Sequence, residues 1–169
     1  EEYYEPLGTW FETHVYPSET GLSVYFRNVT ERKRRRQELA RYRSVVETMS
    51  EGVYIIDEDG HFTLVNDQYA SMVDRPKDEL LGAHVSAVID DEATLEQAAR
   101  LEAELVDGER DSATLEAELQ RPDGESWIGE ATFTVTATVG GHERIGVVRD
   151  VTERRARERR LEQYEQLVE

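Results

Sequence analysis

The amino-acid sequence predicts an α+β domain in which a five-stranded antiparallel sheet carries helices packed on one face, with a further helix at each end. Two runs of strand-forming residues within 52–65, and the alternation of apolar and polar residues in the region 115–148, indicate two groups of strands. The segment between them has helical periodicity instead. Strand groups separated by a block of helices favour an α+β domain over one in which strands and helices alternate.

The first two strands are expected at residues 52–56 and 62–65, where β-branched and aromatic residues predominate. The intervening Asp57-Glu58-Asp59-Gly60 has the composition of a tight turn. It lacks the further spaced oxygen ligands and the closing glutamate of a calcium-binding loop, so we predict no metal site.

Three helices are expected next. Asn66 and Asp67 are good helix starters and precede a short helix that carries Tyr69, Met72 and Val73. A second short helix is expected at residues 77–81, and a longer amphipathic helix follows. Its apolar face comprises Leu95, Ala98, Leu101 and Leu105, whereas Glu96, Glu102 and Glu104 are expected off that face.

The last three strands complete the predicted sheet. In the first of them, Leu115, Ala117 and Leu119 alternate with acidic or amide residues. After a turn at residues 121–124, apolar residues alternate with threonines, as in a half-buried strand. The last strand, at residues 145–148, runs directly into the C-terminal helix.

A long repeat defines the domain organisation. Residues 27–47 and 149–169 are identical at 10 of 21 positions at a constant offset of 122. Upstream, residues 10–30 parallel residues 127–152, aligned from Trp10 and Trp127, with five extra residues in the second copy. We therefore expect residues 1–30 to be the C-terminal hairpin of a preceding, truncated copy, 31–49 a linker helix, 44–150 the complete domain, and 151–169 an output helix.

The two basic helices carry apolar residues at heptad spacing, which is typical of a coiled-coil seam. Each seam is short, so neither helix is expected to be stable without a partner or a flanking domain. We predict a homodimer through these positions, namely Leu39, Tyr42, Val46 and Met49 in the first helix and Leu161, Tyr164 and Val168 in the second.

The charge distribution restricts the range of partners. The net charge is −17, and residues 44–148 alone hold 24 acidic against 6 basic residues. Such a surface repels polyanions. With only two lysines against eighteen arginines, the composition suits a halophilic, cytoplasmic protein, and no segment is apolar for long enough to span a membrane.

The order of elements and several short motifs resemble the PAS domain family. The motifs are Gly52-Val53-Tyr54-Ile55-Ile56-Asp57, Asp59-Gly60, Leu64-Val65-Asn66, Asp78-Glu79-Leu80-Leu81-Gly82, Trp127 and Arg149-Asp150-Val151-Thr152-Glu153-Arg154. The resemblance implies a sensory and dimerisation module, placed in series with other PAS domains or upstream of a two-component histidine kinase or regulator. It also implies that Trp127, Asp150 and Thr152 couple the sheet to the output helix.

The space between sheet and helices is the candidate ligand site. Either this space is a filled core, or it holds a small apolar or planar aromatic molecule that is anchored by a tyrosine hydroxyl. The residues expected to line it are Tyr54, Ile56, Phe62, Leu64, Tyr69, Met72, Val73, Leu101, Leu105, Phe133 and Val135.

The sequence offers little support for a haem or flavin cofactor or for catalysis. The long helix has no histidine that could ligate haem, and the absence of cysteine excludes a cysteine–flavin adduct, so the cofactor is left unknown. No catalytic constellation is present, so this chain is not expected to be an enzyme, although a parent sensor histidine kinase would be one. Two alternatives stay open: a ligand-free spacer and dimerisation element, and a transcription regulator whose basic linkers contact DNA.

Overall fold

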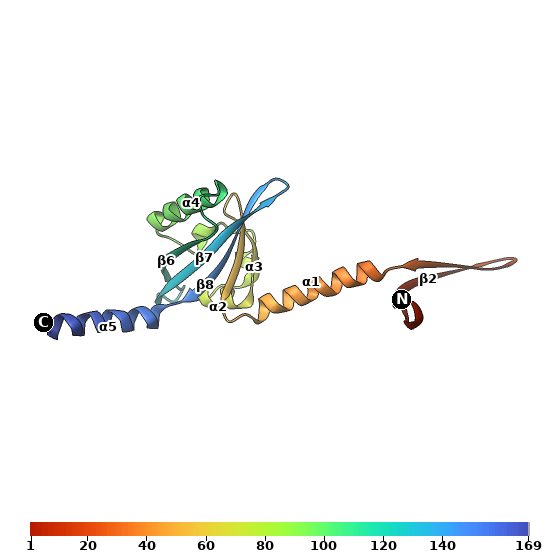
Figure 1. Cartoon of the computed structure of the whole chain (residues 1–169), viewed down its shortest axis with the longest axis horizontal. Coiled ribbons are helices and arrows are strands. Elements are labelled where there is room, and N and C mark those ends of the chain that lie inside the picture. The colour runs from red at the N-terminus through yellow and green to blue at the C-terminus, as the bar shows by residue number, and fades with distance from the viewer. Residues whose placement is uncertain (169) are drawn as a thin grey trace. The chain divides into compact units, whose positions relative to one another are not determined.

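The computed structural model describes residues 1–168, and side chains as far as residue 164. The chain divides into two compact units, Glu1–Thr48 and Met49–Glu169. Each unit is described by itself below, and both are drawn in Figure 1.

The second unit is built on a five-stranded antiparallel sheet with strand order β5-β4-β8-β7-β6. Figure 1 shows the long β7 and β8 crossing its centre. This architecture confirms the predicted α+β fold. The strands are β4 (Gly52–Asp57), β5 (Phe62–Val65), β6 (Ala113–Gln120), β7 (Ser126–Thr138) and β8 (Gly141–Asp150).

Helices connect β5 to β6 and cover the sheet. Their buried side chains join those of the sheet in two neighbouring hydrophobic clusters. The helical segments are α2 (Asp67–Val73), α3 (Lys77–Leu80), the short 3-10 helix η2 (Val85–Ala87) and α4 (Glu92–Val106). The core therefore lies between α2–α4 and the covered face of the sheet.

Asn66 joins the sheet to the first of these helices. Its side chain is fully buried, and its Oδ1 accepts hydrogen bonds from the backbone N–H groups of Tyr69 and Val53, both at 2.8 Å. Its Nδ2 donates to the carbonyl of Glu51 at 3.0 Å. Asn66 is thus the expected helix cap, and it also fixes the start of β4 against α2.

The first unit contains a small antiparallel sheet and one helix. The sheet has the order β1-β2-β3, and its elements are β1 (Glu2–Tyr4), the 3-10 helix η1 (Glu5–Leu7), β2 (Thr9–Ser18) and β3 (Gly21–Asn28). Helix α1 (Thr30–Thr48) follows β3 after one residue, just as α5 (Thr152–Val168) follows β8 in the second unit. Large apolar side chains of the hairpin are exposed, namely Val15, Tyr16, Leu22, Val24, Tyr25 and Phe26.

The strand register corrects one detail of the repeat. Phe11 pairs with Asn28 in the first unit as Gly129 pairs with Asp150 in the second. Trp10 therefore corresponds to Ile128 and not to Trp127, so the expected alignment of the two tryptophans was wrong by one residue. Because side chains alternate along a strand, this shift places the two tryptophans on opposite faces of their sheets.

In the described part of the chain, no helix combines the length and the apolar character needed to cross a membrane.

Candidate functional site

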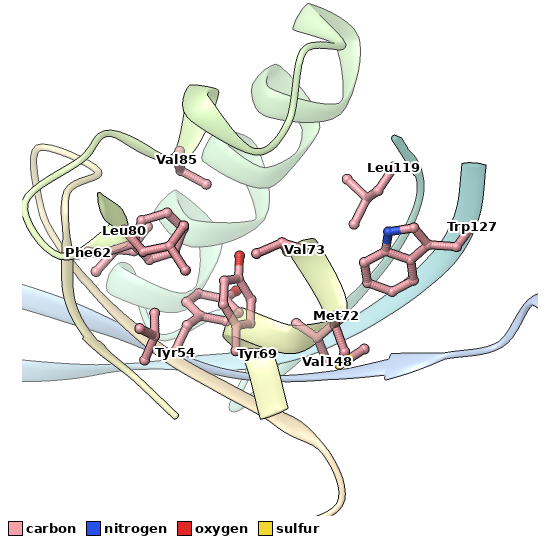
Figure 2. Close-up of a cluster of buried hydrophobic side chains, with 12 residues drawn as sticks. Tyr54, Phe62, Tyr69, Met72, Val73, Leu80, Val85, Leu119, Trp127 and Val148 are labelled. Atoms are coloured by element: carbon pink, nitrogen blue, oxygen red, sulfur yellow. The ribbon is translucent and has the colours of Figure 1, made fainter. Parts of the chain in front are cut away.

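A small cavity lies between the helices and the sheet of the second unit, with a volume of about 50 Å³. Figure 2 shows the cluster around it, with Tyr54 and Tyr69 next to each other and Trp127 and Leu119 at the far side. The cavity is lined by Tyr54, Tyr69, Val73, Val85, Val88, Ile89, Leu115, Ala117, Leu119, Trp127, Gly129, Ala131, Arg144 and Val148.

The structure brings together only part of the predicted lining. Tyr54, Tyr69 and Val73 face the cavity, while Ile56, Phe62 and Met72 are buried in the same cluster but are not lining residues. Four others, Leu101, Leu105, Phe133 and Val135, belong to the second cluster, which α4 forms with β6 and β7. The expected single interior is thus divided into a cavity and a filled core.

Leu64 does not face the interior at all. Its side chain is 36% exposed, whereas Phe62 and Val65 on the same strand are buried. Ile55 pairs with Leu64 but Ile56 pairs with Phe62, so the strand carries a β-bulge at Thr63. The extra residue shifts the alternation by one position, which is why the predicted inward pair of Phe62 and Leu64 was wrong.

The size of the cavity determines which molecules fit. About 50 Å³ is a third of the roughly 150 Å³ that accommodates benzene in an apolar protein cavity. The planar aromatic ligand that the sequence left open is therefore too large for this cavity.

Tyr54 forms one wall of the cavity because β8 has a glycine beneath it. A Cβ atom built on Gly146 would lie 2.3 Å from Cζ of Tyr54. The tyrosine ring also contacts Tyr69, with ring centroids 5.6 Å apart. Burial raises the pKa of both phenols, so each hydroxyl stays protonated near neutral pH.

A buried ion pair, which sequence reasoning missed, lies beside Tyr54 and includes one residue of the cavity lining, Arg144. Arg144 on β8 is 4% exposed, and its Nη1 donates to Oε2 of Glu102 on α4 at 3.0 Å. The other carboxylate oxygen of Glu102 lies 2.8 Å from Nε2 of His142. The guanidinium carbon of Arg144 is 5.0 Å from the ring centroid of Phe133 and 5.9 Å from that of Tyr54.

Glu102 was expected off the apolar face of its helix, and that prediction was wrong. It lies four residues after Ala98 and three before Leu105, which are both buried. These spacings place it on the buried face. On β8, Arg144 alternates with Gly146 and Val148 on the inward face. The spacing along the helix and along the strand could thus have indicated that Glu102 and Arg144 both point inward. It could not have indicated that the two side chains form an ion pair.

Two buried nitrogen atoms at the cavity have no hydrogen-bond partner among the described residues. They are Nε1 of Trp127, on a side chain 3% exposed, and Nε of Arg144. Figure 2 shows the indole nitrogen at the edge of the ring nearer to Leu119. Because indole and guanidinium N–H groups only donate hydrogen bonds, the cavity presents donors and no matching acceptors at these two points.

The joint between β8 and α5 lies beside the cavity wall. Oδ1 of Asp150 accepts hydrogen bonds from the backbone N–H of Thr152 at 2.9 Å and from its hydroxyl at 2.6 Å. Oγ1 of Thr152 in turn accepts from the backbone N–H of Ile128 on β7 at 2.9 Å. Since Ile128 follows Trp127, the cavity wall and the root of α5 are one residue apart.

The first unit has the same joint. Oδ1 of Asn28 accepts from the backbone N–H of Thr30 at 3.0 Å, and Oγ1 of Thr30 accepts from the backbone N–H of Trp10 at 2.9 Å. Val29 donates to the carbonyl of Trp10 as Val151 donates to that of Ile128. Asparagine and aspartate thus serve the same purpose at the two joints.

Ion pairs also hold the first turn of α5 to the sheet. The Arg155 guanidinium donates to both carboxylate oxygens of Glu116 on β6, with Nε at 2.9 and 3.1 Å. Nη2 of Arg154 lies 2.6 Å from Glu130 on β7 and 3.5 Å from Glu116. The hydrogen bonds from Arg155 hold the pKa of the Glu116 carboxyl below its usual value. These four residues are called the joint ion pairs below.

The first unit repeats these ion pairs. Arg32 lies 2.7 Å from Glu1 and 3.7 Å from Glu12, and Lys33 lies 2.8 Å from Glu1. By the strand register, Glu1 corresponds to Glu116 and Glu12 to Glu130. These sheet contacts of Arg32, Lys33, Arg154 and Arg155 had no signal in the sequence, because their acidic partners lie far away along the chain.

Arg121 connects the cavity wall to the joint. Its Nε donates to the carbonyl of Met72 at the end of α2, and its guanidinium carbon lies 5.7 Å from the ring centroid of Trp127. Its Nη2 is 3.9 Å from Oδ2 of Asp150. Trp127, Asp150 and Thr152, which were singled out as coupling residues, therefore lie in one contiguous group.

The seam residues on the two terminal helices are mostly exposed. Leu39, Tyr42, Leu161 and Tyr164 are each 64–69% exposed, while Val46 and Met49 are partly buried. The side chain of Val168 lies outside the described residues. Exposed leucine and tyrosine at heptad spacing leave an apolar stripe on each helix.

Comparison with known proteins finds similarity to PAS domains. The sequence profile described as PAS fold matches residues 46–156. A PAS domain of an HTR-like protein from Haloarcula marismortui is 19% identical, with 71% of this chain and 97% of that one covered and a TM-score of 0.58. A PAS domain from a two-component sensor histidine kinase is 15% identical, with 69% and 98% covered and a TM-score of 0.56.

A third solved structure covers more of this chain. An RNA-binding light-oxygen-voltage receptor is 21% identical, with 94% of this chain and 43% of that one covered and a TM-score of 0.64. No curated protein sequence matches the chain.

Proposed function

The chain belongs to the PAS family, and on that premise we propose that its domain at residues 44–150 senses a small molecule and passes its state to helix α5. One observation carries the proposal. The backbone N–H of Ile128, which binds the Thr152 hydroxyl at the root of α5, is adjacent in the chain to Trp127 in the cavity wall.

The mechanism follows from these contacts. A molecule that displaces the Trp127 indole would also move Ile128, because a strand residue cannot shift alone within a paired sheet. The hydrogen bonds of Thr152 and Asp150 would then lengthen or re-form, and the first turn of α5 would change its direction or its stability. We propose that α5 transmits this change to a following domain without any chemical step in this chain.

Loss of the cap is expected to loosen α5 selectively. Asp150→Ala removes both hydrogen bonds that Asp150 accepts from Thr152. Thr152→Val removes the hydrogen bond that the Thr152 hydroxyl accepts from the backbone N–H of Ile128. Loss of a cap costs about 1 kcal/mol, so exchange of backbone amides in residues 152–158 should accelerate about fivefold. Hydrogen exchange followed by mass spectrometry measures this rate segment by segment.

The first unit supplies the matched control. Asn28→Ala at the equivalent joint should accelerate exchange in α1 and leave α5 unchanged, while Asp150→Ala should do the reverse. Unchanged protection of α5 in both Asp150→Ala and Thr152→Val would contradict the proposed joint.

We also propose that the exposed seam mediates homodimerisation. Leu39→Glu with Tyr42→Glu places like charges on two heptad positions that are 69% and 67% exposed. Sedimentation velocity should then show a monomer where the unmodified chain is a dimer. Arg41→Glu, one position away from the apolar stripe, is the matched control. An unchanged dimer in the double variant would remove the seam as the interface.

Two alternatives lead to different expectations. A ligand-free spacer would leave α5 unaffected by any change confined to the cavity. A DNA-binding linker would have to use arginines other than Arg154 and Arg155, which already contact Glu116 and Glu130, and it would adjoin a domain that holds 24 acidic against 6 basic residues. We therefore favour the sensory function, in a halophilic, cytoplasmic signalling protein that carries further PAS or kinase domains.

A further inference from the structure

His142 lies between carboxylates from two different elements. Its Nε2 is 2.8 Å from Oε1 of Glu102 on α4, and its Nδ1 is 4.0 Å from Oε2 of Glu58 in the turn between β4 and β5. A Cβ atom built on Gly141 would overlap Oε2 of Glu58, so this carboxylate lies directly against the start of β8. The two nitrogen atoms of the His142 ring are therefore each close to a different acid.

A neutral imidazole can bind only one of these two acids. Glu102 also accepts a hydrogen bond from Arg144 at 3.0 Å, so it acts as an acceptor, and Nε2 of His142 must carry the hydrogen of the neutral ring. Nδ1 then directs a lone pair at the Glu58 carboxylate, and no hydrogen bond can form between them. A proton added to Nδ1 creates a second N–H donor. Because the Glu58 side chain is 50% exposed, it has room to close the remaining gap.

We propose that His142 is a proton-dependent clasp, which on protonation binds Glu58 and fastens the turn between β4 and β5 to β8 and α4. Histidine is the side chain whose charge ordinarily changes between about pH 5 and 8. Among the described residues, the charged groups that face the ring are Glu102 and Glu58, with Arg144 beyond Glu102. Arg144 also lines the cavity, so the added charge acts next to the proposed ligand site. The domain thereby gains an input, acidity, in addition to the proposed sensing of a small molecule.

Two further histidines lie near the same turn and determine how the experiment must be designed. Nδ1 of His61 is 3.5 Å from Oδ1 of Asp57, and the ring centroids of His61 and His84 are 5.5 Å apart. Histidine side chains as a class change charge over the same pH range, so the pH dependence of the whole unit does not isolate His142. A double-mutant cycle solves this problem, because His61 and His84 are present in all four proteins of the cycle.

The cycle comprises the unmodified pair, Glu58→Gln, His142→Gln and the double variant, each in a Trp10→Phe background. Trp127 is then the only tryptophan, so its fluorescence follows the thermal unfolding of the second unit alone. At about pH 5.5 the two replacements should be non-additive by about 2 °C in melting temperature, the size expected of a partly exposed ion pair. At about pH 8.5 they should be additive, since the stability that the protonated form contributes is lost as the pH rises through the range of histidine.

Two variants serve as controls. Asp59→Asn removes one negative charge from the same turn, yet no ion pair joins Asp59 to His142 in the described part of the chain. It should therefore show no coupling with His142→Gln at either pH. Gly141→Ala keeps both partners but displaces the Glu58 carboxylate, so it should abolish the coupling at about pH 5.5.

The clasp is refuted by additive replacements at about pH 5.5, by equal coupling at both pH values, or by an equal coupling of Asp59→Asn with His142→Gln. None of these measurements uses α5 or a ligand of the cavity. Their failure therefore removes the clasp alone, whereas unchanged exchange of α5 in the Asp150 and Thr152 variants removes the proposed relay.

Discussion

Glu102→Ala is expected to destabilise the second unit by about 3 kcal/mol, because it leaves the Arg144 guanidinium buried without its carboxylate. Removal of one partner from a buried ion pair leaves a charge that water cannot solvate. Glu102 also accepts from His142, so β8 loses two contacts with α4 at once. Urea unfolding followed by circular dichroism gives the change in the free energy of unfolding.

A second glutamate on the same helix, which pairs with a residue beyond the end of that helix, provides the control. Glu104 lies 2.7 Å from Arg110, and both side chains are more than a third exposed. Glu104→Ala should therefore change stability by less than about 1 kcal/mol. The double replacement of Glu102 by Leu and Arg144 by Met should recover most of the lost stability, since apolar substitutes often match a buried ion pair. Equal effects of Glu102→Ala and Glu104→Ala would show that the Arg144 pair is not buried as described.

Gly146→Ala is expected to destabilise the domain by about 1–3 kcal/mol and to displace Tyr54. The added Cβ would lie 2.3–2.5 Å from two ring carbons and the hydroxyl oxygen of Tyr54, on a central strand that cannot yield without breaking its pairing with β4 and β7. The ring must therefore move toward the cavity and reduce its volume. Thermal unfolding measures the loss of stability. The indole N–H signal of Trp127 in a proton–nitrogen correlation spectrum reports the change in the cavity.

Two further variants separate this clash from a general effect of alanine. Gly140→Ala, where no atom lies within 4 Å of the new Cβ, should leave the melting temperature unchanged. In a Tyr54→Leu background, Gly146→Ala should cost less than it does in the unmodified chain, because the ring it strikes is absent. An additive effect of the two replacements would count against the contact.

The sequence predicted the elements well because each depends on a local pattern. Residues 62–65 and 115–119 have the composition or alternation of strands, the apolar residues of α4 recur at helical spacing, and Asn66 caps α2 as expected. The family resemblance rested on the same local motifs. Each of these patterns depends only on residues that are close together in the sequence, so it can be recognised without knowledge of the fold.

The errors arose where one residue or one distant partner decides the outcome. The bulge at Thr63 turns Leu64 outward, and nothing in the composition of residues 62–65 marks it. A similar shift of one residue misaligned Trp10 with Trp127. The pair of Glu102 and Arg144 joins α4 to β8 across 42 positions, so only the folded sheet and helix bring the two charges together.

The repeated joint ion pairs have a consequence for how such chains can be recombined. Arg154 and Arg155 pair with Glu116 and Glu130 at the positions where Arg32 and Lys33 pair with Glu1 and Glu12, although Arg154 lies nearer to Glu130 and Arg32 nearer to Glu1. A helix transplanted from one joint to the other would therefore find carboxylates at matching places. Under the proposed relay, this boundary would serve as a shared connector, and neighbouring domains could be exchanged, duplicated or deleted during evolution without redesign of the helix that follows them.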